Sequence, residues 1–103
     1  MELNESNFES EAIESTVPVL IDFFAPWCGP CRMLIPVLEK LEIEFGETAK
    51  VCKVNVDENP ELATRYKVGS IPHIIFMKEG IIEDQIIGFP GEEVLREKLT
   101  ALR

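Results

Sequence analysis

Residues 17–25 read Val17-Pro18-Val19-Leu20-Ile21-Asp22-Phe23-Phe24-Ala25 and are apolar except for Asp22. This apolar run is rich in β-branched and aromatic residues, which predicts a strand buried on both faces. The segment that follows it reads Pro26-Trp27-Cys28-Gly29-Pro30-Cys31. A helical pattern comes next, with one apolar face formed by Leu34, Leu38, Leu41 and Phe45. The order is therefore a buried strand, a short turn with two cysteines and a long amphipathic helix.

The rest of the chain alternates between helices and strands in the same way. We expect three more helices, over Asn4–Ser15, from Asn59 to about Tyr66 and after Gly91. We expect three more strands, over Val51–Val56, Ile74–Met77 and Ile81–Ile87. Parallel strands need a crossover helix, whereas strands joined by a tight turn are antiparallel. The sequence therefore predicts an α/β fold, with a mixed sheet and helices on both of its faces.

Length and charge narrow the class of protein. The chain has 103 residues, so we expect a single domain over residues 1–103. The net charge of −9 argues against binding to nucleic acid or to an anionic membrane surface. The N-terminal residues are acidic and polar, unlike a signal peptide, and no apolar run is long enough to span a membrane. We therefore expect a cytoplasmic protein.

The two cysteines three positions apart carry the chemistry. Cys28 falls at the predicted start of a helix, where free N–H groups and the helix dipole favour a thiolate, the nucleophilic form of cysteine. Cys31 lies one turn further on and can attack the Cys28 sulfur within a mixed disulfide. Gly29 and Pro30 keep the loop tight. Pro36 lies inside the helix and is expected to kink it, because its ring displaces a backbone hydrogen bond.

Other interpretations of this spacing stay open at this point. The pair could be half of a zinc site, although only Cys52 and His73 remain to complete four ligands. It could also be a static structural disulfide, or an accidental spacing. Cys52 lies in a strand that is predicted to be central, and we interpret it as a small buried hydrophobic residue.

The segment from Phe23 to Met33 closely resembles the active-site segment of the thioredoxin family, and the resemblance runs over essentially the whole chain. Further matching residues are Asp22, Pro36, Lys53, Asn55-Val56-Asp57, Asn59-Pro60, Tyr66-Lys67-Val68-Gly69-Ser70-Ile71-Pro72 and Gly88. The resemblance implies the thioredoxin fold, in which a mixed central sheet of about five strands is flanked by about four helices in three layers. It also implies a protein-disulfide reductase, with Cys28 as nucleophile and Cys31 as resolving cysteine. It also implies re-reduction by a thioredoxin reductase and protein disulfides as substrates. We expect no bound cofactor and no metal, and the redox-active group is the disulfide Cys28–Cys31. We also expect the protein to be a monomer.

The resemblance also assigns a role to a buried acid. The family's aspartate at the position of Asp22 lies beneath the cysteines and moves a proton to or from the inner thiol. Lys53 matches the lysine that partners this acid. Burial of Asp22 should raise its pKa. The alternatives are an acid at a strand end that faces water and an ordinary lysine on a solvated face.

A substrate-binding collar is implied around Cys28. The family's proline at the position of Pro72 is cis and faces the cysteines, which leaves the backbone of Ile71 free to pair with an extended substrate segment. Trp27, Ile71, Pro72 and Gly88 would together form a small apolar collar. The alternatives are a trans turn proline at Pro72 and a packing role for Trp27 in the core.

Several residues depart from the commonest family pattern, and they are Phe24, Pro26, His73 and Phe89-Pro90. Of these, His73 follows the expected cis-proline and is titratable, so it could tune the cysteines or simply end a strand. Two other functions stay open. One is an oxidant or isomerase for secreted proteins, although such relatives usually carry histidine in place of Pro30. The other is a binding module that uses the fold as a scaffold.

Overall fold

The computed structural model describes residues 1–103 and has a central sheet of five strands in the order β1-β3-β2-β4-β5. The strands are β1 (Glu2–Leu3), β2 (Val19–Phe24), β3 (Lys50–Asn55), β4 (His73–Lys78) and β5 (Ile81–Ile87). The three strands β1, β3 and β2 run parallel, whereas β2 pairs with β4 and β4 with β5 in the antiparallel sense. The predicted mixed sheet is confirmed.

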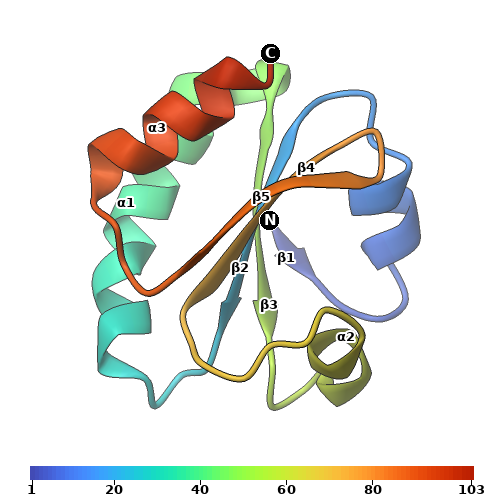
Figure 1. Ribbon diagram of the computed structural model, residues 1–103, viewed down its shortest axis with the longest axis vertical. Coiled ribbons are helices and arrows are strands. Elements are labelled where there is room, and N and C mark those ends of the chain that lie inside the picture. Colours follow the sequence, from blue (N-terminus) through green and yellow to red (C-terminus); the bar gives the residue numbers. More distant parts are fainter.

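Helices cover both faces of this sheet, as Figure 1 shows. The long helix α1 (Gly29–Phe45) and the C-terminal helix α3 (Glu92–Ala101) lie on one face. The short π-helical turn η1 (Glu9–Ile13) and helix α2 (Pro60–Arg65) lie on the other. A 3-10 turn η2 (Gly46–Thr48) joins α1 to β3. The three-layer α/β arrangement of the thioredoxin fold is therefore confirmed.

The sheet separates two hydrophobic cores because successive side chains of a strand point to opposite faces. Leu20 packs in the core beneath α1 and α3, with Leu34 and Leu95. Ile21 and Phe23 pack in the core on the side of η1 and α2. By the same alternation, Asp22 lies on the α1 side of β2. The strand is buried along almost its whole length, as its apolar sequence predicts.

The N-terminal segment differs from the expected helix. Only Glu9–Ile13 are helical, and β1 was not predicted. The Asn4 side chain accepts hydrogen bonds from the backbone N–H groups of Ser6 and Asn7, at 2.9 and 3.1 Å, and holds the chain in a turn there. Asparagine side chains compete with helical hydrogen bonds in this way. Two residues of strand are too short to give a sequence pattern.

The turn that carries the two cysteines lies at the C-terminal end of β2, the central strand of the sheet. Strand β2 ends at Phe24, and α1 begins at Gly29 with Cys28 as its N-cap. Helix α1 continues through Pro36, whose missing N–H cannot donate within the helix. No helix in the structure is both long enough and apolar enough to cross a membrane.

Candidate active site

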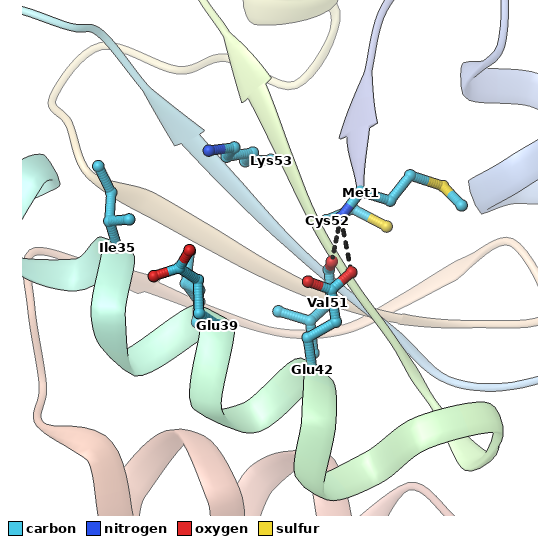
Figure 2. Close-up of a pocket in the computed structure, with 8 residues that line it drawn as sticks. Met1, Ile35, Glu39, Glu42, Val51, Cys52 and Lys53 are labelled. Carbon is cyan, nitrogen blue, oxygen red and sulfur yellow. Dashed lines mark hydrogen bonds and ion pairs between the residues drawn. The ribbon is translucent and has the colours of Figure 1, made fainter.

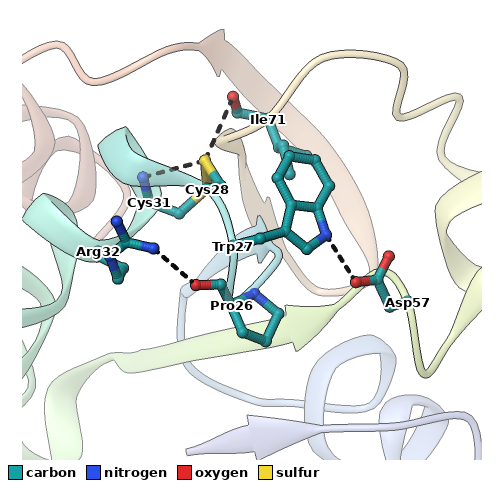
Figure 3. Close-up of a disulfide and its surroundings, with 7 residues drawn as sticks. All are labelled: Pro26, Trp27, Cys28, Cys31, Arg32, Asp57 and Ile71. Atoms are coloured by element: carbon teal, nitrogen blue, oxygen red, sulfur yellow. Dashed lines mark hydrogen bonds between the residues drawn. A yellow bond between two sulfur atoms is a disulfide. The ribbon is translucent and has the colours of Figure 1, made fainter.

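A disulfide joins Cys28 to Cys31 at the start of α1, and their Cα atoms are 5.2 Å apart (Figure 3). The Cys28 sulfur accepts a hydrogen bond from the backbone N–H of Cys31 at 3.2 Å, as an N-cap side chain does. Pro30 occupies the first turn and contributes no N–H of its own. The N–H of Cys31 and the helix dipole therefore act together on Cys28 Sγ, and both would stabilise a thiolate there once the disulfide is reduced.

Both cysteine side chains are buried at the start of α1. Cys28 is 6% exposed and Cys31 is 2% exposed, and both pack against Ala25 and Phe24. Cys28 lies at the end of the helix, where a partner can approach it, whereas Cys31 lies one turn inside. Cys28 is therefore the outer cysteine of the pair and Cys31 the inner one.

The loop before β4 faces the disulfide. The Ile71–Pro72 peptide bond is cis, and the carbonyl oxygen of Ile71 lies 3.9 Å from Cys28 Sγ (Figure 3). The N–H of Gly88 donates to the carbonyl oxygen of Pro72 at 2.8 Å. Gly88 has a φ of +96°, a conformation that a side chain would strain. Three of the predicted collar residues are thus connected to one another or to Cys28.

Trp27 is not a core residue, because 68% of its surface is exposed. Its indole N–H donates to the Asp57 carboxylate at 2.9 Å, just beyond the end of β3 (Figure 3). This bond fixes the ring beside Cys28. Sequence reasoning did not select Asp57 as a site residue. The available signal was a polar residue directly after a buried strand that neighbours β2.

Asp22 is buried, with 2% of its surface exposed, so it does not face water. Its Oδ1 atom has no hydrogen-bond partner. Burial disfavours the charged carboxylate and raises its pKa from 3.8 to about 7, although the positive charge of Lys53 acts in the opposite direction. The carboxyl group can therefore bind and release a proton near neutral pH.

Lys53 lies on β3 directly opposite Asp22 in the parallel register. Its ammonium group is 5.5 Å from the centre of the Phe24 ring, a cation–π distance. It forms no ion pair with Asp22. The structure thus brings the predicted pair to neighbouring positions, with the charge of Lys53 acting on Asp22 at a distance.

His73 and Cys52 lie apart from this chemistry. His73 pairs with Phe23 across β2 and β4, which places it on the sheet face opposite Asp22, and its Nε2 lies 2.8 Å from the side-chain oxygen of Gln85. Cys52 is buried and unpaired, and burial raises its pKa to about 11. No group of three or more His, Cys, Asp or Glu side chains is arranged to hold a metal ion.

Comparison with known proteins identifies relatives along nearly the whole chain. A family model described as Thioredoxin matches residues 1–101. Thioredoxin 1 of Synechococcus elongatus is 44% identical over 97 residues, which cover 94% of this chain and 91% of the relative. The Bacillus subtilis protein named thioredoxin is 45% identical over 93 residues, 90% of this chain and 88% of its own length. The chloroplastic M-type thioredoxin of Pisum sativum is 43% identical over 97 residues, 94% of this chain and 56% of its own length.

Proposed function

Since this chain belongs to the thioredoxin family and is a thiol–disulfide oxidoreductase, we propose that it reduces protein disulfides through Cys28 and is re-reduced by a thioredoxin reductase. One observation carries the proposal. Cys28 Sγ lies at the start of α1, hydrogen-bonded to the N–H of Cys31 and facing the Ile71–Pro72 loop. This sulfur thus lies where a thiolate is stabilised, beside the loop before β4 and next to Cys31.

The first step is attack of the Cys28 thiolate on one sulfur of a substrate disulfide. A new bond forms between Cys28 Sγ and that sulfur, the substrate S–S bond breaks, and the other substrate sulfur leaves as a thiolate that takes up a proton. The N–H of Cys31 and the dipole of α1 stabilise the attacking thiolate. The product is a mixed disulfide.

The second step uses Cys31 and Asp22. The Cys31 thiol loses its proton and attacks Cys28 Sγ, which closes the Cys28–Cys31 disulfide and breaks the bond to the substrate. The second substrate sulfur leaves as a thiolate that takes up a proton from water. We assign the proton of Cys31 to the Asp22 carboxylate, because a pKa of about 7 lets it accept a proton at neutral pH. The substrate gains two electrons, and the cysteine pair is oxidised by two.

We assign substrate binding to the surface around Cys28. The exposed indole of Trp27 and the Ile71–Pro72 loop flank the sulfur, and the Gly88 N–H holds that loop through the carbonyl of Pro72. An extended polypeptide could pair with the free backbone groups of Ile71. Gly29, Pro30 and Pro36 shape the helix start.

Replacing Pro72 with alanine is expected to slow exchange with protein substrates by about 10-fold or more, because alanine frees the backbone angle φ that proline fixes and so loosens the loop that places the Ile71 carbonyl 3.9 Å from Cys28 Sγ. The measurement is the rate of insulin reduction, with Pro60→Ala at the start of α2 as the matched control. Equal rates in Pro72→Ala and the wild type would count against the docking assignment.

We further propose that the chain is a single thioredoxin domain over residues 1–103 and serves general redox homeostasis in the cytoplasm, as a monomer without nucleic-acid or membrane partners. Bacterial thioredoxins among its relatives support the cytoplasm, whereas a chloroplastic relative is an alternative setting. The net charge of −9 supports the absence of nucleic-acid partners.

The direct test of re-reduction couples three proteins. NADPH oxidation is followed with a thioredoxin reductase, insulin and this chain, and Cys28→Ser is the control. We expect NADPH consumption only with the wild type. If the reductase fails to reduce the disulfide while the chain oxidises thiols of a reduced, unfolded protein, the alternative role as an oxidant is favoured over the reductase role.

A further inference from the structure

A pocket of about 130 Å³ opens between α1 and β3, away from the disulfide (Figure 2). Its apolar side includes Ile35 and Leu38 of α1, and its charged side chains include Glu39 and Glu42 of α1 and Lys53 of β3. The volume is sufficient for several water molecules. The pocket therefore brings Glu39, Glu42 and Lys53 to one opening beneath the helix that carries the cysteines.

Lys53 connects this pocket to the buried acid. It lines the pocket, and it also lies opposite Asp22 in the register between β2 and β3. Lys53 forms no ion pair with Asp22 or with an acid of the pocket. Its ammonium group lies over the Phe24 ring instead. Where the ammonium group rests thus determines how strongly its charge acts on Asp22.

The two acids in the pocket differ in what they contact. Glu42 binds the N-terminal ammonium of Met1 at 2.9 Å. Glu39 has no ion-pair partner. Figure 2 shows it rising from α1 toward the sheet, while Lys53 extends from β3 over the same opening. Glu39 is therefore the acid in this pocket that is available to attract Lys53.

We propose that Glu39 is a positioning residue for the exchange reaction: its carboxylate draws the Lys53 ammonium toward the α1–β3 pocket and limits how strongly Lys53 favours the charged form of Asp22. The inference rests on the proposed function, because it deepens the role of Asp22 there. The positive charge of Lys53 weakens the binding of a proton to Asp22. When Lys53 is held farther away, Asp22 binds the proton of Cys31 more readily.

Few other charges act on this region. Helix α1 contributes Cys31, held in the disulfide, and the two acids of the pocket. Its other charged side chains are engaged elsewhere: Arg32 donates to the Pro26 carbonyl, Lys40 pairs with Glu92, and Glu44 pairs with Arg96. Strand β4 places the uncharged Ile74 opposite Asp22, and α3 contributes leucines to the core on this face. The N-terminal ammonium is held by Glu42. Removing the charge of Glu39 is therefore a selective change.

The test is the titration of Asp22, followed by NMR of its side-chain carboxyl carbon in the oxidised protein. Glu39→Gln is expected to lower the midpoint by about 0.5 pH units, roughly a threefold weaker binding of the proton. Glu39→Asp should retain most of the wild-type value. Glu42→Gln is the matched control, exposed on the same helix, and is expected to shift the midpoint by less than about 0.2 units.

A double-mutant cycle tests whether the effect passes through Lys53. In a Lys53→Met background, Glu39→Gln should shift the Asp22 midpoint by less than about half of the shift that it causes when Lys53 is present. A full shift in that background, or no shift from Glu39→Gln alone, would overturn the proposal. Because this titration does not depend on catalysis, a protein that titrates as expected but fails to reduce insulin would contradict the proposed function alone.

Discussion

Replacing Asp22 with asparagine is expected to raise the free energy of unfolding by up to about 4 kcal/mol at pH 8 and by little near pH 4. The pKa of Asp22 is about 7 in the folded chain against a model-peptide value of 3.8. The folded protein therefore binds one more proton than the unfolded chain between these two pH values, so stability falls as the pH rises across that range. A difference of about 3 units, at about 1.36 kcal/mol each, gives the expected figure.

The measurement is urea unfolding of the oxidised wild type and Asp22→Asn between pH 4 and pH 8. The wild type should lose stability over this range, and most of that loss should be absent from the variant. Glu83→Gln on the exposed edge strand β5 is the control and should behave like the wild type. A variant that is strongly destabilised at every pH would show that the carboxyl group has a structural role.

The same substitution should also slow turnover, because asparagine cannot accept the proton of Cys31. Higher stability combined with lower activity is the signature of a buried group that is kept for its chemistry.

Replacing Cys31 with serine is expected to reduce turnover by at least about 100-fold while leaving the first step intact. A serine hydroxyl does not form an oxyanion at neutral pH and cannot resolve the mixed disulfide. The Cys28 sulfur remains at the start of α1 and can still attack a substrate. The variant should therefore accumulate a covalent complex with insulin chains, seen by mass spectrometry without reductant.

Cys28→Ser is the matched control for this experiment, and no covalent complex is expected because Cys31 lies one turn inside and is 2% exposed. The third cysteine, Cys52, is buried and stays as a neutral thiol. If Cys28→Ser formed the complex instead, the roles of the two cysteines would be reversed.

The framework of the fold could be predicted from the sequence because its elements carry strong local patterns. The buried strand β2 is a continuous apolar run, and α1 presents leucines at helical spacing. The position of Cys28 at the helix start follows from the boundary between those two patterns. Strand β1 could not be predicted, because its two residues owe their extended form to pairing with β3 rather than to local preference.

The features that could not be predicted from the sequence depend on contacts between elements that are far apart along the chain. The bond from Trp27 to Asp57 joins the cysteine turn to the loop after β3. The separation of Lys53 from Asp22 depends on side-chain placement across two strands, which the residue types alone do not determine. The same holds for the pocket that brings Glu39 to Lys53. A single sequence supplies no distance between such segments.

We propose above all that this chain reduces protein disulfides through Cys28. The most direct measurement is the reduction of insulin disulfides driven by dithiothreitol, with the wild type compared with Cys28→Ser. We expect the wild type to accelerate precipitation of the insulin B chain and the variant to match the uncatalysed rate. Equal rates for both proteins would contradict the account and favour a binding role for the fold.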